Sequence, residues 1–330
     1  MTNKVFLSNG RSFDVDEGQT ILSAAVRQGV LLEHSCRTGR CGVCRVKVEQ
    51  GATEALVPED SLADTDSSDG YILTCCRTAI GDVLLAAEDL GELGIVSAKT
   101  LPCRIDALRY LSDDVLEVVL RTPPASKLEY LPGQYIDVIG VSGIRRSYSI
   151  ANARREDGKI ALHIRKVDGG RMSQYWFGEA KVNDLLRLEG ALGTFCLRSG
   201  VAKSLVLLAT GTGIAPLKAI LEQLAADTAC KQYDQIYLYW GGRIEKDIYW
   251  RPDFPKLPLF FTPVLSRCST FKGRTGYVQQ AVLADSIDLT SAEVYACGSD
   301  VMIRSALESM LAAGLDKNKF YSDAFVSSSL

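Results

Sequence analysis

The stretch CRTGRCGVC, from Cys36 to Cys44, decides how the first part of this chain is interpreted. It holds three cysteines at the spacing C-x4-C-x2-C, and Cys75 and Cys76 follow downstream in GYILTCC. The whole chain of 330 residues contains only two histidines. Cysteines that merely fill a core do not gather in sets like this, so the group requires a chemical explanation.

Disulfides, zinc and iron–sulfur chemistry are the competing explanations. The start MTNKVFLSNGRSFDV lacks the apolar segment of a signal peptide, so we expect a cytoplasmic protein, in which thiols stay reduced. Structural zinc takes paired ligands, and the one tight pair here is Cys41 and Cys44, with no histidine pair near it. A Rieske centre needs two histidines, and only His34 is close. The spacing C-x4-C-x2-C with a distant fourth cysteine is that of a plant-type [2Fe–2S] cluster.

The pattern therefore predicts a [2Fe–2S] cluster on Cys36, Cys41, Cys44 and one further cysteine. We expect Cys75 as the fourth ligand and Cys76 as its neighbour, although the spacing alone allows either. The basic residues around the cluster indicate either a positive patch for an acidic partner or a solvated face that tunes the cluster's potential. These residues are Arg37, Arg40, Arg45 and Lys47. The acidic stretch PEDSLADTDSSDG is expected to be a solvated loop.

The segments around the cysteines predict a mixed α and β fold. VFLSNGRSFDV is typical of a hairpin with Asn9 and Gly10 at its turn. GQTILSAAVRQGV predicts a short helix that Thr20 caps and Gly29 ends, and CRVKVEQG alternates like a strand. In this order the elements resemble a plant-type ferredoxin domain with the β-grasp fold, which we expect over residues 1–92.

Beyond an expected linker at residues 93–102, the pattern changes twice. Residues 103–200 contain short alternating runs such as VLEVVLRT, RRSYSI and KIALHIRKV, split by Gly and Pro, which predict a small antiparallel barrel. Over residues 201–330 strands alternate with helices, as in SLVLLATGTGIAP and EVYACGSDVMIRSALESMLAAG, which predicts a parallel α/β sheet. The expected fold class is thus multidomain, α+β followed by α/β.

One motif in the last part is typical of a phosphate-binding turn. ATGTGIAP follows a predicted strand and opens a helix, so its glycines let the backbone approach a pyrophosphate at the helix N-terminus. Its sixth position is Pro216 instead of the glycine of the common dinucleotide motif, so the motif alone is weak. Pro216 suits the first turn of a helix.

Three motifs in order, RRSYS, GTGIAP and YACGS, resemble the ferredoxin–NADP reductase superfamily. With the ferredoxin-like segment, the resemblance covers essentially the whole chain. It implies a six-stranded FAD-binding barrel and a nicotinamide-binding α/β domain, because relatives with the cluster at the N-terminus use FAD. It also implies that NADH gives a hydride to flavin N5 and that single electrons pass through the [2Fe–2S] cluster to a partner protein.

The resemblance assigns roles around the flavin. Arg146 matches the arginine that neutralises a flavin phosphate, and Tyr148 and Ser149 match residues that touch the isoalloxazine. The stretch HIRKVDGGRMS matches the segment that runs past the flavin to its pyrophosphate. The cofactor contacts expected in this stretch are His163, Gly170, Met172 and Ser173. Of these, His163 is expected to be a strand residue and not a catalyst.

The resemblance places the nicotinamide site in the α/β part. Cys297 and Gly298 match the C-G pair beside nicotinamide C4, and Phe325 matches an aromatic that covers the flavin and moves for hydride transfer. The expected catalytic residues are Tyr148, Ser149, Cys297 and Phe325. Further expected contacts to the nicotinamide cofactor are Gly211, Thr212, Gly213, Pro216, Gly241 and Arg243. GGRIEKDIYW mixes acidic and basic residues, which favours NADH over NADPH, although Arg267 would suit a 2′-phosphate.

The resemblance also implies a partner. YLPGQYIDV, LHIRKV, VYACGS and KFYSDAFV resemble the CDP-6-deoxy-3,4-glucoseen reductases, whose electrons go to a pyridoxamine-phosphate dehydrase. The reductase component of an aromatic-ring dioxygenase or di-iron monooxygenase, which shares the domain order, is an alternative. An alternative of another class is a zinc-binding sensor module with a degenerate nucleotide fold. The net charge of -3 argues against a nucleic-acid partner, no apolar stretch is long enough for a membrane span, and we expect a monomer.

Overall fold

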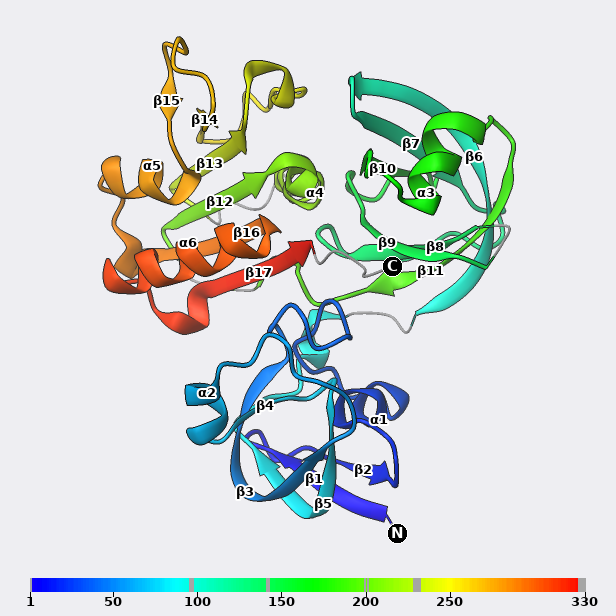
Figure 1. The fold of residues 1–330 in the computed structure, drawn as a ribbon, viewed down its shortest axis with the longest axis vertical. Coiled ribbons are helices and arrows are strands. Elements are labelled where there is room, and N and C mark those ends of the chain that lie inside the picture. The colour runs from blue at the N-terminus through cyan, green and yellow to red at the C-terminus, as the bar shows by residue number, and fades with distance from the viewer. Residues whose placement is uncertain are drawn as a thin grey trace. The chain divides into compact units, whose positions relative to one another are not determined.

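The structure is a computed structural model that describes residues 2–94, 98–140, 143–198, 200, 202–227 and 233–325. The described chain forms two compact units (Figure 1). The first lies within residues 2–94 and the second spans Ala98–Phe325. Among the described residues, no helix is both long and apolar enough to cross a membrane.

The first unit is a five-stranded mixed sheet with a short helix on it. Its elements are β1 (Thr2–Leu7), β2 (Ser12–Asp16), α1 (Ile21–Arg27), β3 (Arg45–Ala55), α2 (Asp64–Ser68), β4 (Tyr71–Leu73), β5 (Arg77–Leu85) and the 3-10 turn η1 (Gly91–Leu93). The strand order is β2-β1-β5-β3-β4, with β1 parallel to β5. Thr20 caps α1 by accepting the Ser23 N–H at 3.2 Å, as expected. Gly10 closes the β1–β2 turn in the left-handed conformation, which confirms the hairpin.

Two expectations for this part of the chain differ from the structure. The acidic stretch contains helix α2, and two of its carboxylates form close ion pairs, Glu59 with Arg77 at 2.7 Å and Asp66 with Arg45. The sequence did not predict these ion pairs, because the basic partners lie on β3 and β5, outside the acidic stretch. The next strand, β6 (Lys99–Ser112), begins inside the expected linker. The sequence did not predict its first residues as strand, because a proline such as Pro102 is typical of non-strand segments. Residues 95–97 lie outside the described chain.

The first half of the second unit is an antiparallel barrel. Its further elements are β7 (Val115–Arg121), β8 (Tyr135–Ile139), β9 (Arg145–Ser149), β10 (Ile160–Arg165), α3 (Arg171–Gln174), the π-helical turn η2 (Tyr175–Glu179) and β11 (Leu185–Leu192). The six strands run in the order β10-β7-β6-β11-β8-β9. A bridge between Ile150 and Leu162 joins the two ends of this order, and both side chains are fully buried. The expected six-stranded barrel is therefore confirmed.

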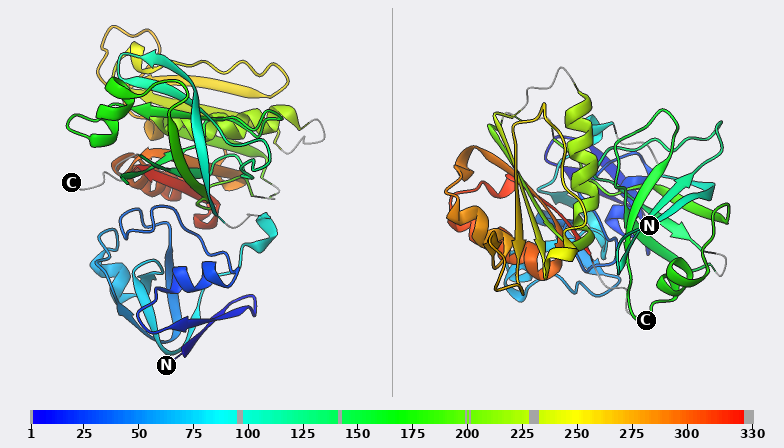
Figure 2. Two further views of the ribbon diagram at one scale, coloured as in Figure 1. Left: turned by 90° about the vertical axis from the view of Figure 1, so that its right-hand side faces the viewer. Right: turned by 90° about the horizontal axis from the view of Figure 1, so that it is seen from above.

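The second half of this unit is a parallel sheet with helices on both faces (Figure 2). Its elements are β12 (Ser204–Thr210), η3 (Gly211–Gly213), α4 (Ile214–Ala226), β13 (Gln235–Gly242), η4 (Glu245–Asp247), β14 (Leu259–Leu265), β15 (Arg274–Thr275), α5 (Val278–Ala284), η5 (Leu289–Ser291), β16 (Ala292–Ser299), α6 (Asp300–Ala312), η6 (Lys317–Lys319) and β17 (Phe320–Phe325). The order β15-β14-β13-β12-β16-β17 reverses direction between β12 and β16. In open parallel sheets, ligands bind beyond the strand ends at such a switch point.

Candidate functional site

The cysteines of the first unit lie together as two pairs. Cys44 Sγ lies 3.3 Å from Cys75 Sγ, and the Cys41 sulfur accepts the Cys36 backbone N–H at 3.5 Å. Each iron of a [2Fe–2S] cluster takes two cysteine sulfurs, so two adjacent pairs fit its four ligands. Within the described chain, no three His, Cys, Asp or Glu side chains form a group suited to one metal ion. Four cysteine thiols in two adjacent pairs are the donor set that a two-iron cluster takes.

Hydrogen bonding favours the thiolate form of one sulfur in each pair. The Cys41 thiol, followed by Thr38, holds the pKa of Cys36 down to about 5. The Cys44 thiol likewise lowers the pKa of Cys75 to about 7. Because the thiolate is the form that binds metal, these sulfurs are prepared as ligands.

The structure distinguishes Cys75 from Cys76. Cys76 is fully buried, and its thiol points to the Pro58 carbonyl at 3.5 Å. A Cβ at Gly39, whose φ is +76°, would lie 2.7 Å from the Cys76 sulfur. The Cys76 thiol therefore packs against the cluster loop at a position where only glycine fits. Cys75 instead faces Cys44. The geometry supports the prediction that Cys75 is the fourth ligand.

Two of the basic residues near the cysteines are neutralised. Arg45 pairs with Asp66, and Arg40 lies 3.6 Å from Asp60. The guanidinium of Arg45 also lies 4.5 Å from the centre of the Tyr71 ring. These contacts reduce the positive charge that Arg40 and Arg45 offer to an acidic partner.

In the second unit, Tyr148 is fixed on β9 by a neighbouring tryptophan. Its hydroxyl accepts the indole N–H of Trp176 at 3.0 Å, and the two rings meet edge to face. Burial raises the pKa of Tyr148 to about 12, so the phenol is protonated at neutral pH. Arg146, on the same face of β9, donates to the Arg145 carbonyl, and among the described residues its guanidinium has no carboxylate partner. The group thus offers an aromatic surface and a cation, which suit a flavin and its phosphate.

The segment after β10 turns into α3 at Gly170. The Ser173 hydroxyl accepts the Val167 N–H at 2.9 Å, which leaves its own O–H free to donate. Met172 is buried, and a Cβ at Gly140 would lie 3.2 Å from its sulfur, so its side chain belongs to the barrel core. Of these predicted contacts, Ser173 offers a hydroxyl and Met172 only its backbone, whereas the Gly170 N–H already donates to the Val167 carbonyl at 3.0 Å.

The predicted nicotinamide residues meet at the carboxyl ends of the parallel strands. Gly211–Gly213 follow β12, Gly241 and Arg243 mark the end of β13, and Cys297 and Gly298 end β16. A Cβ at Gly213 would lie 2.1 Å from the Cys297 carbonyl oxygen, so this turn packs directly on β16. Thr212 lies in the same turn, and Pro216 is buried in the first turn of α4, as expected. Phe325 ends the adjacent β17 with 40% of its surface exposed.

A residue without a predicted role joins the barrel to this edge. Asp323, in FYSDAFV, is 5% exposed and pairs in register with Cys297. Its Oδ2 accepts the Ser149 hydroxyl at 3.2 Å and lies 3.9 Å from the Cys297 sulfur. Burial, followed by this carboxylate, raises the pKa of Cys297 well above its usual value, so the thiol is neutral. The available signal was an acidic residue inside an apolar strand, but only strand order shows what it faces.

One predicted contact, His163, lies elsewhere, and another, Arg243, lies at the outer edge of the strand ends. The His163 ring is buried against Tyr249, 3.2 Å from its hydroxyl, and faces Glu117 instead of the Tyr148 group. Arg243 is exposed beyond β13, and its carbonyl accepts the Arg267 N–H at 2.9 Å. The Asp247 carboxylate accepts the Arg243 N–H at 2.6 Å. Acidic and basic groups thus meet where the adenosine end of a nicotinamide nucleotide would lie.

Three family models match consecutive parts of the chain. Residues 5–80 match the 2Fe-2S iron-sulfur cluster binding domain. Residues 102–196 match the oxidoreductase FAD-binding domain, and residues 207–308 match the oxidoreductase NAD-binding domain. The matched models correspond in order to the cysteine loop, the barrel and the parallel sheet.

Known proteins match over nearly the full length. The CDP-6-deoxy-L-threo-D-glycero-4-hexulose-3-dehydrase reductase of Yersinia pestis is 41% identical over 97% of both chains. The toluate 1,2-dioxygenase electron transfer component of Pseudomonas putida is 29% identical over 96% of both chains. Among solved structures, a cytochrome P450 reductase of Amycolatopsis has a TM-score of 0.76 and 28% identity, covering 98% of this chain and 99% of its own.

Proposed function

The chain belongs to the three-domain iron–sulfur flavoprotein reductases of the ferredoxin–NADP reductase superfamily, and on this premise we propose that its electron acceptor is a pyridoxamine-phosphate dehydrase acting on a CDP-linked deoxyhexulose. It is a nicotinamide-dependent oxidoreductase that uses FAD and a [2Fe–2S] cluster. The observation that carries the proposed partner is the 41% identity over 97% of the Yersinia pestis reductase, against 29% for the dioxygenase component.

The residues of the second unit have distinct tasks in this proposal. When bound, FAD takes a hydride from the reduced nicotinamide and passes electrons singly to the cluster. Arg146 holds a flavin phosphate, and Trp176 fixes the Tyr148 phenol against the flavin site. Asp323 orients the Ser149 hydroxyl and faces the neutral Cys297 thiol, so both side chains are held where the two domains meet. Phe325, half exposed at the same strand edge, covers the site.

We propose NADH as the electron donor. The Asp247 carboxylate lies directly after β13, where it accepts the backbone N–H groups of Arg243 and Ile244 at 2.6 and 3.2 Å. A negative charge at this point disfavours a 2′-phosphate. Arg165 lies 3.5 Å from this carboxylate, and Arg243 and Arg267 would attract a 2′-phosphate, so the preference depends on the balance between the carboxylate and these guanidinium groups.

The first test is an anaerobic titration of the purified protein with NADH, followed by visible absorption. Loss of both flavin and iron–sulfur bands is expected. Bleaching of the flavin alone would mean that the cluster lies off the electron path, and a colourless protein with zinc would overturn the function.

The second test identifies the acceptor by reconstitution with each candidate partner. Turnover is expected with a pyridoxamine-phosphate dehydrase and its CDP-hexulose substrate. Turnover only with an oxygenase component would favour the second candidate, which the 29% identity to the toluate dioxygenase component over 96% of the chain supports. Sedimentation of the loaded protein alone tests the proposed monomer.

A further inference from the structure

A pocket of about 480 Å³ opens between the barrel and the α/β half of the second unit. The outer faces of β6, β7 and β10 form one wall, and helix α4 and the segment after η4 form the other. The residues that give it its chemistry are Arg109, Glu117, Arg155, Lys218, Trp250 and Arg251. Of the cofactor contacts predicted from the sequence, its lining contains His163 but not Tyr148, Ser149 or Cys297.

Positive charge dominates this pocket. Its described lining contains three arginines and one lysine but a single carboxylate, Glu117, which pairs with Arg109 at 3.0 Å. Arg155 and Arg251 are exposed, and within the described chain neither guanidinium has an ion pair or a hydrogen bond. Arg109 and Lys218 each have a carboxylate partner, so the charge that would attract an anion comes mainly from Arg155 and Arg251.

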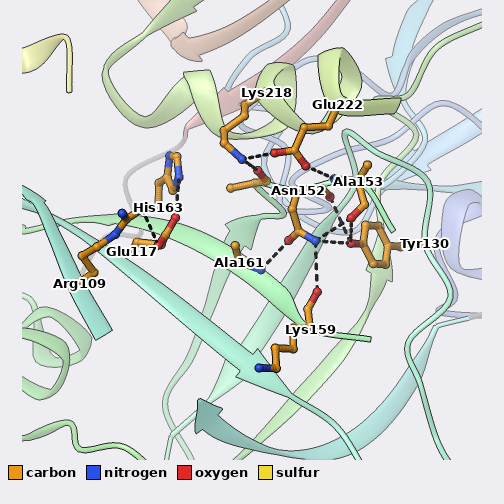
Figure 3. A network of polar contacts seen from close by, with 11 residues as sticks. Arg109, Glu117, Tyr130, Asn152, Ala153, Lys159, Ala161, His163, Lys218 and Glu222 are labelled. Atoms are coloured by element: carbon orange, nitrogen blue, oxygen red, sulfur yellow. Dashed lines mark hydrogen bonds and ion pairs between the residues drawn. The ribbon is translucent and has the colours of Figure 1, made fainter. Parts of the chain in front are cut away.

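The floor of the pocket is buried and contains an ammonium that is paired with a carboxylate. The Lys218 side chain is 12% exposed, pairs with Glu222 on the next turn of α4 and donates to the Ala151 carbonyl at 2.9 Å. An ammonium has three N–H donors, so one remains for a ligand. Figure 3 shows Lys218 and Glu222 together above the His163 ring, with Arg109 and Glu117 beside it. Burial lowers the pKa of His163 to about 3, so its ring is neutral.

Trp250 adds an apolar wall to the pocket. Its ring is half-buried and is held by aromatic neighbours, with centroids 6.5 Å from Trp240 and 6.2 Å from Phe254. A fixed aromatic ring beside cations suits a ligand that carries both a flat ring and phosphates. The volume of about 480 Å³ lies within the range of ordinary small-molecule sites and is far larger than a single phosphate needs.

We propose that this pocket binds a phosphorylated small molecule of nucleotide size, with its phosphates against Arg155, Lys218 and Arg251 and its ring on Trp250. A nucleoside diphosphate and free pyrophosphate share this phosphate chemistry, so both are used as probes. Lys218 also donates to the carbonyl of Ala151, which lies two residues after Ser149. A ligand bound to Lys218 would therefore be linked through this residue to the segment that carries the predicted flavin contacts.

The test measures binding to the full chain loaded with FAD and cluster. Isothermal titration with UDP and with inorganic pyrophosphate is performed in the presence of saturating NAD, which occupies the nicotinamide site. Arg155→Glu and Arg251→Glu are each expected to weaken the binding of both probes by about tenfold or more. Arg187→Glu, on an exposed β11 residue outside the pocket lining, is the charge-matched control and should leave binding unchanged.

Trp250→Ala separates the two sources of phosphate. Weaker UDP binding with unchanged pyrophosphate binding supports the nucleotide ligand, whereas an equal affinity for both probes in every protein would overturn the proposed ring contact with Trp250. The proposal is overturned if neither probe binds at millimolar concentration, if the glutamate variants bind like the Arg187→Glu control, or if NAD displaces the probes. Flavin content and melting temperature verify that each variant is folded.

Discussion

The Ser149 hydroxyl donates a hydrogen bond to Asp323 Oδ2 at 3.2 Å, although the two residues are 174 positions apart in the sequence. Ser149 ends a barrel strand and Asp323 lies on the last strand of the parallel sheet. The same oxygen lies 3.9 Å from the Cys297 sulfur. The buried Asp323 carboxylate therefore contacts both Ser149 in the barrel and Cys297 in the sheet, two residues that the sequence predicts to be catalytic.

Asp323→Asn should slow flavin reduction by NADH by about tenfold or more, because the charge that orients Ser149 and faces Cys297 is lost while the shape is kept. Stopped-flow absorption of the loaded protein measures this rate. Flavin content should stay normal. A wild-type rate in Asp323→Asn would remove Asp323 from the proposed site.

Trp176→Phe should weaken FAD binding by about fivefold to tenfold, because Tyr148 loses the indole donor at 3.0 Å and a single hydrogen bond contributes about 1 kcal/mol. Flavin fluorescence on dilution measures the affinity. Trp250→Phe, on a tryptophan away from Tyr148, is the control and should retain FAD. Equal FAD retention by both variants would contradict the positioning role of Trp176.

Cys75→Ser should lose the [2Fe–2S] absorption, whereas Cys76→Ser should keep it, because only the Cys75 sulfur faces Cys44. Iron content and visible absorption measure the outcome. The two adjacent cysteines are matched controls for each other. Loss of the cluster in Cys76→Ser alone would exchange their roles.

Cys41→Ser should abolish one-electron transfer to cytochrome c and leave NADH reduction of a small two-electron acceptor, 2,6-dichlorophenolindophenol, largely intact. The reason is that the cysteine loop serves the cluster, whereas the flavin and nicotinamide residues lie in the second unit. Steady-state rates with the two acceptors measure this. Survival of both activities would place the cluster off the path.

His163 should make the second unit less stable in acid. Its pKa is lowered to about 3 in the folded state, chiefly by burial, against 6.5 when unfolded. Between these values the unfolded chain binds the extra proton, so the unfolding free energy falls as the pH decreases below about 6.5, by up to about 1.4 kcal/mol per pH unit. Lys218 and Arg109 add to this shift, and Glu117 and Tyr249 also face the ring.

His163→Gln should remove this component and flatten the dependence of stability on pH. Urea unfolding followed by flavin fluorescence, at pH 7.5 and pH 5.5, measures the difference between the two proteins. Parallel pH dependences would show that His163 takes up no proton on unfolding.

The sequence was sufficient wherever a structure depends on neighbours along the chain. The spacing from Cys36 to Cys44 describes one loop, Thr20 lies next to the helix that it caps, and the glycines before Pro216 form the turn from β12 into α4. The alternation of short strands, followed by strands with helices, predicted the barrel and the parallel sheet. Such signals survive because hydrogen bonding and hydrophobic periodicity act over a few residues.

Tertiary structure decided which distant side chains meet. The position of the Cys76 thiol depends on Gly39 and Pro58, and the place of Asp323 depends on β17 pairing with β16 in register. The cationic pocket brings Arg109, Lys218 and Arg251 together from three separate elements. No local sequence pattern predicts these contacts, because they join residues far apart in the chain and depend on strand order and helix packing.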